Sequence, residues 1–395
     1  MEAIIRSESK VPFRFNLSLG VVTHVPHWMG PDGAIWAYEP YVREIRLWAD
    51  LFSQVEISAP RADARPEGSQ ACYDRQNVTW RPFNYSMSYS RWAPLRRLSQ
   101  LPIVAQNVHR LVRRSDLVHL RSPGHPALVG HFLVRLMNKR SITKWAGFFG
   151  PFEGERLPSR VERRLVKWAP HRHPTLIYGT SNDDGFVPFL PALMSNQEIS
   201  RAQELARLRR WTRPWKLLSV GRLLRVKGFD LAIRGLGELK QMASNLEWEY
   251  TIIGDGPALE ELEALAKSVG IQSHVRFEGA LSFADVQRHY GQAHVAIMPG
   301  TKEGWPKVIA EAWAHGAVPA AAAAGLVPSI MRGETSGIVF EPNATALATA
   351  LAALLNSPER LRYLSRRVVK EAESLSLECF KARLEQVLID RCGLL

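Results

Sequence analysis

The sequence lacks the features that mark secreted and membrane-spanning proteins. It holds only three cysteines, Cys72, Cys379 and Cys392, which are too few and too scattered for a disulfide framework or a cysteine-ligated zinc cluster. No uninterrupted apolar run reaches the roughly 18 residues that suggest a membrane-spanning helix. The opening residues, MEAIIRSESKVPFRFN, contain no apolar core of a signal peptide, so we expect none. These absences favour a cytoplasmic protein with reduced thiols.

The signatures of three further classes are also missing. No D-x-D pair and no cluster of His, Cys and acidic residues at metal-ligand spacing occurs, so we expect neither a metal nor a cofactor. No aromatic-interleaved basic motif or known reader module appears, so we expect no nucleic-acid partner. A nicotinamide oxidoreductase would carry a full dinucleotide fingerprint on the first strand of a domain, followed by an acid about 20 residues later, and this pattern is absent.

The charge that is present is mostly positive, and most of it lies in the first half. The chain carries 51 Lys and Arg against 38 Asp and Glu, a net charge of +13. Residues 1–195 hold 26 basic and 16 acidic residues, and the remaining residues hold 25 and 22. The first half therefore carries a net +10 and the second a net +3. The charge alone would suit nucleic acid, anionic lipid or a phosphorylated substrate, and without a nucleic-acid reader motif the last two are favoured.

The most basic stretch, residues 81–114, contains no acid. Its cations are Arg81, Arg91, Arg96, Arg97, Arg110, Arg113 and Arg114, interleaved with Trp92, Leu95, Leu98, Leu101, Ile103 and Val104. A basic amphipathic helix of this kind can dock on an anionic membrane, where each cation adds about 1 kcal/mol. The alternative is a solvated helix whose apolar face packs on the first domain's sheet. The pattern leaves both interpretations open.

Apolar strands alternate with helical stretches along the chain. A chain of 395 residues exceeds one ordinary core, so two domains are expected. Residues 18–25 are typical of a buried strand, residues 34–52 of a helix, and residues 190–215 of a linker region. This order predicts an α/β fold with two facing Rossmann-like domains, each a parallel sheet flanked by helices, and a ligand cleft between them.

In such sheets ligands bind beyond the carboxyl ends of the strands. The stretch SVGRLLRVKGFDLAI (219–233) places Gly221, Arg222 and Lys227 between a strand and a helix. Backbone N–H groups at a helix start, together with two cations, can grip a diphosphate, although a basic surface loop is the alternative. Gly254 in the next such turn, IIGDGP, belongs to only half of a dinucleotide fingerprint.

Two glutamates stand eight positions apart in TKEGWPKVIAEAWAHG (301–316). An apolar strand precedes them, so Glu303 is expected in the loop beyond its carboxyl end, and Pro306 suits the first helical turn. Glu311 then lies about 7.5 Å along the helix axis from Pro306, too far for a close acid–base pair with Glu303. The two acids could bracket an extended ligand by accepting hydrogen bonds from sugar and ribose hydroxyls. An exposed helix with stray acids is the alternative.

Together these stretches resemble a known family. The series SVGRLxxxKGF, IIGDGP, VRFEG, EGWPKVIAEA and GETSGIVFEPN is similar to the C-terminal domain of the family-four retaining glycosyltransferases, also called glycosyl transferases group 1. The resemblance is dense over residues 215–355 and implies the GT-B architecture of two facing Rossmann-like domains. It also implies metal-independent transfer of a sugar from a nucleotide-diphosphate sugar to an acceptor hydroxyl, with retention at the anomeric carbon.

The resemblance implies roles for individual residues. Arg222 and Lys227 would bind the donor diphosphate and carry the charge of the leaving group. Glu303 would hold donor-sugar hydroxyls, and Glu311 would hold the ribose. The donor-binding residues implied are Gly221, Arg222, Lys227, Gly254, Phe277, Gly279, Glu303, Gly304, Trp305, Pro306 and Glu311.

The first domain is similar to the family more loosely. Gly30 and Gly33 fit the expected glycine loop after the first strand. Many members carry a second histidine at a strand end near the anomeric carbon, where DLVHLRSP has Arg121, so Arg121 is expected in the catalytic site and His119 in a structural role. The possible substitutes near the acceptor are His24, His27 and His125. The stretch VPAAAAAGLVPSI also departs from the family pattern, so an unusual donor-sugar pocket is expected.

We expect an acceptor-binding domain over residues 1–195, a nucleotide-sugar-binding domain over 196–375, and a C-terminal helix over 376–395 that packs back toward the first domain. The resemblance implies a hexosyltransferase of cell-surface polysaccharide or glycolipid synthesis, with a lipid-linked or polysaccharide acceptor. It would work in the cytoplasm or on the inner face of the cytoplasmic membrane. A GT-B-like nucleotide-sugar epimerase and a catalytically degenerate sugar-nucleotide-binding relative stay open as alternatives.

Overall fold

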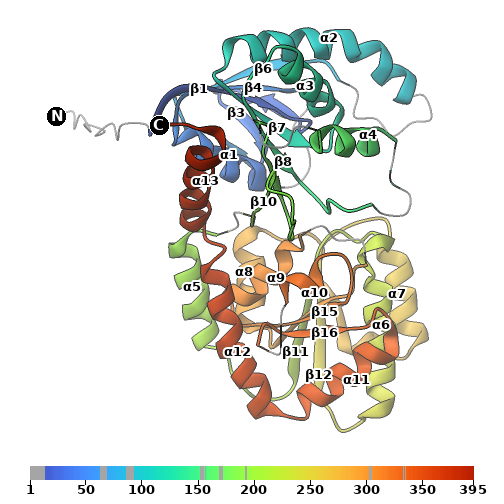
Figure 1. Cartoon of the computed structure of the whole chain (residues 1–395). Coiled ribbons are helices and arrows are strands. Elements are labelled where there is room, and N and C mark those ends of the chain that lie inside the picture. The colour runs from blue at the N-terminus through green and yellow to red at the C-terminus, as the bar shows by residue number, and fades with distance from the viewer. Residues whose placement is uncertain are drawn as a thin grey trace, which may run out of the picture.

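The computed structural model describes residues 14–62, 69–85, 93–151, 155, 157–168, 172–191, 194–301, 305–331, 333 and 335–395, with the side chains of helix α2 from residue 99 onward. Within these ranges the chain forms two domains, one above the other in Figure 1. Each domain is a parallel sheet with helices on both faces. The α/β fold with two Rossmann-like domains is therefore confirmed.

The first sheet has the strand order β10-β9-β8-β7-β1-β4-β6. The order reverses between β1 and β7, where Val22 pairs with Leu120, so the loops beyond these strands leave the sheet at one level. Its strands are β1 (Phe15–Val22), β4 (Phe52–Pro60), β6 (Val78–Phe83), β7 (Leu117–Ser122), β8 (Ser141–Trp145), β9 (Thr175–Ile177) and β10 (Phe186–Pro188). A small antiparallel sheet adds β2 (His27–Met29), β3 (Ile35–Tyr38) and β5 (Gln70–Cys72).

The second sheet has the order β13-β12-β11-β14-β15-β16 and reverses between β11 and β14. Val220 pairs with Ile253, so Gly221 and Gly254 follow neighbouring strands at the same level. The strands are β11 (Trp215–Val220), β12 (Trp248–Ile253), β13 (Val275–Phe277), β14 (Val295–Met298), β15 (Val318–Ala322) and β16 (Ile338–Phe340).

Helices cover both faces of each sheet. Helices α1 and α13 pack on one face of the first sheet, and α2 and α3 on the other. In the second domain α6, α7 and α11 lie on one face, and α5, α8 and α9 on the other. The helices are α1 (Glu39–Ala49), α2 (Ala93–Arg114), α3 (His125–Leu136), α4 (Leu157–Val166), α5 (Asn196–Arg207), α6 (Phe229–Met242), α7 (Leu259–Ser268), α8 (Phe283–Gln292), α9 (Lys307–Ala314), α10 (Val327–Ile330), α11 (Ala344–Leu355), α12 (Pro358–Glu373) and α13 (Leu377–Cys392).

Two early elements differ from the prediction. The strand expected over 18–25 is β1, which ends at Val22, and the helix expected over 34–52 is a short strand, β3, followed by α1. Trp36 of β3 pairs with Trp28 and Cys72 in the small sheet. Aromatic and β-branched residues favour strands, and this cross-strand pairing cannot be seen in a local helical pattern.

Helix α2 buries its apolar face. Val104, Val108 and Leu111 are fully buried in a cluster with residues of β7 and α3. Arg81 is not in this helix, because it lies in β6 and pairs with Glu56 at 2.8 Å. Over its described side chains, α2 is therefore a solvated helix packed on the sheet. Arg91 and Trp92, and the side chains of Leu95, Arg96, Arg97 and Leu98, lie outside the described residues.

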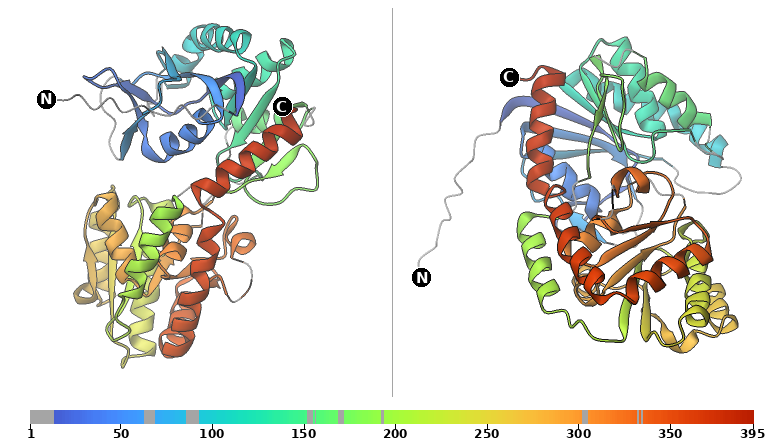
Figure 2. Two further views of the ribbon diagram at one scale, coloured as in Figure 1. Left: turned by 90° about the vertical axis from the view of Figure 1, so that its left-hand side faces the viewer. Right: turned by 60° about the horizontal axis from the view of Figure 1, so that its bottom comes forward.

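Helix α13 crosses from the second domain to the first (Figures 1 and 2). Its side chains Phe380, Leu384 and Leu388 are buried in the core cluster formed with α1, β1 and β4. The Phe380 ring meets the ring of Phe189 edge-on, with centroids 4.9 Å apart. The last helix of the chain is thus part of the first domain's core.

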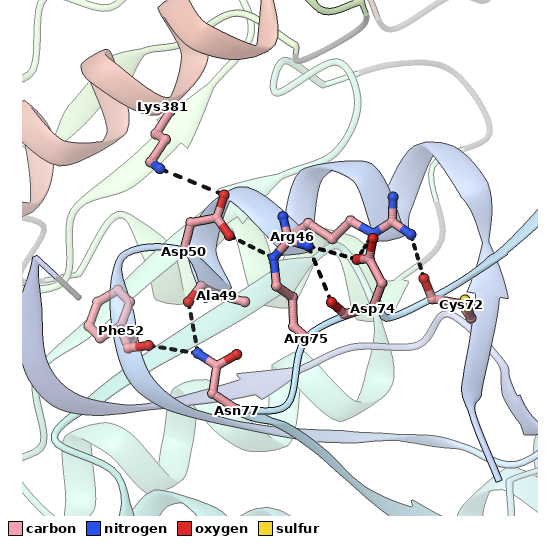
Figure 3. Close-up of polar contacts among 9 residues, drawn as sticks. All are labelled: Arg46, Ala49, Asp50, Phe52, Cys72, Asp74, Arg75, Asn77 and Lys381. Atoms are coloured by element: carbon pink, nitrogen blue, oxygen red, sulfur yellow. Dashed lines mark hydrogen bonds and ion pairs between the residues drawn. The ribbon is translucent and has the colours of Figure 1, made fainter. Parts of the chain in front are cut away.

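Polar contacts fix the end of α1 beside α13 (Figure 3). The Asp50 carboxylate pairs with Arg75 at 2.7 Å and lies 3.6 Å from the Lys381 ammonium of α13. The Asn77 amide donates to the carbonyl oxygens of Ala49 and Phe52, both at 2.8 Å. These contacts hold α1, which carries two side chains into the site described below.

Candidate active site

The second sheet reverses its order between β11 and β14, and the loops beyond these strands meet there. This strand order is that of a dinucleotide-binding fold, in which ligands bind in the crevice at the reversal. A Cβ on Gly228 would lie 2.5 Å from the carbonyl oxygen of Pro299, so the β11 loop touches the segment that leads towards α9. Gly228 also has a φ of 68°, which favours glycine.

The β11 loop presents cations at a helix start. Arg222 is exposed, and Lys227 ends a 3₁₀ turn that Gly228 joins to α6. The first N–H groups of a helix and its dipole stabilise an anion. Arg225 in the same turn pairs with Glu261 at 3.0 Å. The loop can therefore offer Arg222, Lys227 and the start of α6 to a diphosphate.

Backbone contacts join the loops beside it. The Gly221 N–H donates to the Ile253 carbonyl at 2.9 Å, and the Gly254 N–H donates to the Gly279 carbonyl at 2.8 Å. A Cβ on Gly254 would lie 1.9 Å from the Gly221 carbonyl oxygen, so only glycine permits this approach. Phe277 is half-buried at the end of β13. These four candidate residues therefore lie side by side where the loops leave β11, β12 and β13.

Glu311 lies in α9, half-buried on the other side of the crevice. The Tyr290 hydroxyl of α8 hydrogen-bonds to its carboxyl group. Burial raises the pKa of Glu311 above its usual value, while Tyr290 and the nearby Lys307 ammonium oppose the rise. Tyr38, at the end of β3 in the first domain, interacts electrostatically with both Glu311 and Arg222. Both donor-side candidates therefore face the first domain.

Two predicted donor residues, Glu303 and Gly304, lie outside the described residues. Trp305 and Pro306 follow them and are buried, and Pro306 is the N-cap of α9. Trp305 lines a cavity of about 340 Å³ together with residues of both domains, including Arg383 of α13. The described part of this stretch thus borders the space between the domains.

Three first-domain candidates meet where the first sheet reverses its order. The Arg121 guanidinium at the end of β7 lies over the Tyr41 ring, 4.9 Å from its centroid. A Cβ on Gly124 would lie 2.7 Å from Nδ1 of His24, so the loops beyond β1 and β7 are in contact. Burial, and then the charges of Arg121 and His125, lower the pKa of His24 to about 4. His24 is therefore neutral at neutral pH.

A buried ion pair lies beside Arg121. The Lys144 ammonium donates to the Glu44 carboxylate of α1 at 2.6 Å, and both side chains are buried. Lys307 of the second domain interacts electrostatically with Glu44, Lys144 and Arg121. Burial lowers the pKa of Lys307 to about 8. The Nε and Nη1 groups of Arg121 are buried and have no hydrogen-bond partner among the described residues. Here the two domains together form a positively charged site.

The structure corrects the prediction that His27 contacts the acceptor. His27 is fully buried, with Nδ1 2.8 Å from a backbone carbonyl and Nε2 3.1 Å from the Tyr73 hydroxyl. Its ring stacks on Tyr73 and Trp80. Because the core uses both ring nitrogens, His27 cannot reach an acceptor. His119 is also fully buried, 4.5 Å from the ring of Trp48, in the structural role expected.

Gly30 and Gly33 form a hairpin turn rather than a strand-to-helix loop. The Gly30 N–H donates to the Ala34 carbonyl at 2.9 Å, and the Gly33 N–H donates to the Gly30 carbonyl at 3.0 Å. The turn joins β2 to β3. The strand β3 that follows the turn ends at Tyr38, and this residue interacts with Glu311 and Arg222 of the second domain.

Over the ranges that the structure describes, no group of three or more His, Cys, Asp or Glu side chains could hold a metal ion. Within the same ranges, no helix is both long and apolar enough to cross a bilayer.

Comparison with known proteins identifies the family. Residues 200–371 match the family model described as Glycosyl transferases group 1. A GDP-mannose-dependent alpha-(1-6)-phosphatidylinositol monomannoside mannosyltransferase of Mycobacterium tuberculosis is 29% identical over 351 residues, 86% of this chain and 81% of that protein. The protein of the same name from Mycolicibacterium smegmatis is 31% identical over 36% of this chain, and the match spans only 39% of that relative. The region 200–371, which holds most of the second domain, therefore belongs to the group 1 glycosyltransferases.

Solved structures share the two-domain architecture of this chain. Sucrose-phosphate synthase from Thermosynechococcus elongatus superposes with a TM-score of 0.68 at 15% identity, covering 96% of this chain and 100% of that one. HepE from Anabaena, in complex with UDP and glucose, superposes with a TM-score of 0.67 at 14% identity, covering 94% and 99%. At such identities the likeness concerns the fold, and it confirms the GT-B architecture.

Sequence reasoning missed several residues of the site. Lys307 directly follows Pro306 in the stretch 301–316. A cation at the start of an otherwise apolar helix could have identified it as a site residue. Tyr38 and Tyr290 gave no signal, because they reach the cleft from β3 and α8 through tertiary packing. The pair of Glu44 and Lys144 joins residues 100 positions apart.

Proposed function

We propose that this group 1 glycosyltransferase moves a hexosyl group from a nucleotide-diphosphate sugar to an acceptor hydroxyl, with retention and without a metal ion. The observation that carries the proposal is the crevice between the β11 and β14 loops. Arg222, Lys227 and the start of α6 lie on one side, and Glu311, held by Tyr290, lies on the other. The complex of HepE with UDP and glucose supports the proposal, because that protein shares the fold.

Each part of the crevice has a task in this reaction. The bond between the anomeric carbon and the diphosphate oxygen breaks, and the diphosphate leaves with the electron pair. A bond forms from the anomeric carbon to the acceptor oxygen, and the hydroxyl proton passes to the departing diphosphate or to water. Arg222, Lys227 and the α6 start would neutralise the departing charge. Glu311 would accept hydrogen bonds from the ribose diol, and Glu303 would accept them from sugar hydroxyls.

We propose an acceptor that carries a phosphate group close to its reacting hydroxyl. Among the described residues, Lys307 interacts with the cations Arg121 and Lys144 and with the acids Glu44 and Glu311, so cations outnumber acids once Arg222 and Lys227 are assigned to the donor. The unpartnered N–H groups of Arg121 suit a phosphate oxygen. The names of the relatives, which include a D-inositol 3-phosphate glycosyltransferase of Corynebacterium aurimucosum at 28% identity, describe phosphate-bearing acceptors. Glycolipid or cell-surface polysaccharide synthesis would fit such an acceptor.

We also propose that the protein works on the inner face of the cytoplasmic membrane when the acceptor is lipid-linked. The exposed cations Arg110, Arg113 and Arg114 of α2 would contribute to docking on anionic lipid. Because the apolar face of α2 is buried, the contact would be electrostatic and would weaken steeply with salt. Sedimentation with anionic vesicles at increasing salt tests this location, and salt-independent binding would contradict it.

The experiment for the activity is a turnover panel. Nucleotide-diphosphate sugars are mixed with phosphorylated polyols and their neutral counterparts, and released nucleoside diphosphate is measured. NMR then assigns the anomeric configuration of the product. We expect release that needs a phosphorylated acceptor, a product with the donor's configuration, and no loss with a chelator. Inversion, or abolition by the chelator, would contradict the mechanism. An epimerised nucleotide sugar would identify an epimerase, and binding without turnover would identify a degenerate relative.

A further inference from the structure

Two adjoining pockets open on the second domain, away from the cleft. One, of about 540 Å³, is lined by residues of α5, α8 and the segment that leads into β11. The other, of about 820 Å³, lies between that segment and α12, and the two share Arg210 and Thr212. Lys216 and His294 of the first pocket stand at the amino ends of β11 and β14. The donor loops leave from the carboxyl ends of the same strands, so the pockets and the donor loops lie at opposite ends of the second sheet.

The described lining of the two pockets is strongly basic. It contains eight cations and no acid, and the cations are Arg207, Arg209, Arg210, Arg213, Lys216, Arg288, Arg362 and Arg366. Arg288 pairs with Asp285. In the part of the chain that the structure describes, the others form no ion pair. Ordinary basic surfaces carry interspersed acids, whereas here unneutralised cations surround a shared hollow.

The segment between α5 and β11 is held rigidly. The buried Arg209 guanidinium donates to the backbone carbonyls of residues 290, 291, 315 and 316, at 2.6 to 3.2 Å. Burial lowers its pKa to about 10, so it stays charged at neutral pH. The guanidinium carbons of Arg209 and Arg362 lie 5.7 and 5.8 Å from the centroid of the Trp211 ring.

A histidine fixes the backbone at the start of β11. Nδ1 of His294 accepts from the Lys216 N–H, and Nε2 donates to the Arg210 carbonyl, both at 2.9 Å. Burial lowers the pKa of His294 to about 4, so the histidine adds no charge at neutral pH. The side chains of Arg210, Arg213 and Lys216 remain exposed on this fixed backbone. A fixed backbone lowers the entropy that is lost when a ligand orders these side chains.

We propose that the two pockets form a second anion-binding site, separate from the donor crevice, for a phosphate-bearing ligand. Arginine predominates among the lining cations, and its planar fork matches phosphate oxygens in pairs. Repulsion among Arg207, Arg210, Arg362 and Arg366 disfavours the empty site and would be relieved by an anion. The ligand is a free phosphate compound or an anionic lipid headgroup. Leu208 and Tyr363 beside the pockets are 78% and 56% exposed, which also suits a headgroup.

The test uses the whole chain and Arg210→Glu, because Arg210 lines both pockets. Arg234→Glu is the matched control, since it makes the same charge change at an exposed arginine of α6 outside both pockets. One arm titrates inorganic pyrophosphate by calorimetry at about 0.15 M salt, with the donor crevice filled by saturating UDP or GDP. The other arm sediments the protein with vesicles of phosphatidylglycerol and phosphatidylcholine, or of phosphatidylcholine alone.

We expect at least one probe to bind, and Arg210→Glu to lose at least tenfold in affinity while Arg234→Glu keeps it. Pyrophosphate binding with this pattern identifies a site for a free phosphate compound, and vesicle binding with this pattern identifies a headgroup site. Arg210→Gln should also raise the melting temperature at low salt, because it relieves repulsion in the empty site. Binding of neither probe, equal losses in both charge-reversal variants, or vesicle binding lost only with Arg110→Glu on α2, would overturn the proposal.

Discussion

At the scale of single residues, Glu311 illustrates what a pattern can and cannot predict. Its spacing from Glu303 and its place after a strand made it a candidate, since both features are local. Its partner Tyr290 was not predictable, because the hydroxyl arrives from another helix. His27 was assigned wrongly for a related reason. A histidine in a loop after a strand resembles a ligand contact, and only the aromatic core around it reveals a structural role.

Tyr290→Phe tests how Glu311 is held. Nucleotide binding through Glu311 needs its carboxylate form, so affinity should fall as pH drops through the raised pKa of this group. Loss of the Tyr290 hydroxyl, which opposes that rise, should move the midpoint to higher pH. At neutral pH we expect a loss of about 1.5 kcal/mol, or about tenfold, in calorimetry with nucleoside diphosphate.

Tyr250→Phe is the matched control for this variant. Its hydroxyl is also buried, but it donates to Ser219 at 2.7 Å, away from Glu311. The control should lose some stability while keeping the pH midpoint. A wild-type midpoint in Tyr290→Phe would disprove the contact between Tyr290 and Glu311 as a determinant of binding.

At the scale of elements, the alternation of strands and helices was predictable from periodicity, whereas the hairpin of β2 and β3 was not. Its strands are short, and whether they form depends on partners in other strands, which a local sequence pattern does not show.

A second feature that the sequence did not reveal is the buried cluster that joins α4, α3 and β7. Glu162 accepts a hydrogen bond from the Gly124 N–H at 2.9 Å, and Nε2 of His131 lies 3.0 Å from the Ser122 hydroxyl. The cluster fixes the loop that follows Arg121.

Glu162→Gln should change how stability depends on pH. Burial raises the pKa of Glu162 to about 7, while hydrogen bonds from Ser122 and Gly124 oppose the rise. Burial also lowers the pKa of the neighbouring His131 to about 3, so the His131 ring stays neutral at the pH values at which Glu162 titrates. At pH values between the usual pKa of a glutamate and about 7, the folded protein therefore keeps the Glu162 proton that the unfolded chain has released. The contribution of Glu162 to the free energy of unfolding falls as the pH rises through this range. Above that pH the buried carboxylate costs about 3 kcal/mol, which glutamine avoids.

The measurement is the free energy of unfolding of both proteins across this pH range. The difference between them should grow in favour of Glu162→Gln as pH rises, whatever other groups titrate in both. Glu263→Gln, at an exposed residue of α7, should follow wild type. Parallel curves for Glu162→Gln and wild type would show that Glu162 is already ionised throughout.

At the scale of the whole molecule, two domains followed from length and from the repeated rhythm, and the family followed from motifs clustered in the second half. The face between the domains was beyond prediction, because Arg121, Lys307 and Glu44 come from distant parts of the chain. The contact residues of α13 were equally hidden, since an apolar stripe does not identify the surface that it covers.

Leu384→Ala tests the place of α13 in the first domain's core. Leu384 is fully buried there, so its truncation should cost about 2–5 kcal/mol. Hydrogen exchange should quicken in β1 and β4, although these strands lie more than 300 residues earlier in the chain. Gln386→Ala, on the exposed side of the same helix, should leave exchange unchanged. Unchanged exchange in both variants would contradict a structural role for α13 in this domain.

Calorimetry of Lys227→Ala with nucleoside and with nucleoside diphosphate tests whether the β11 loop binds a diphosphate. Arg225→Ala is the control, because it removes a cation of the same turn whose guanidinium is directed to Glu261 of α7. We expect Lys227→Ala to weaken the diphosphate by about 1.5–3 kcal/mol, at least tenfold, and to leave the nucleoside unchanged. Arg225→Ala should bind both ligands like wild type. Equal losses for both ligands in Lys227→Ala, or equal behaviour of the two variants, would contradict the account.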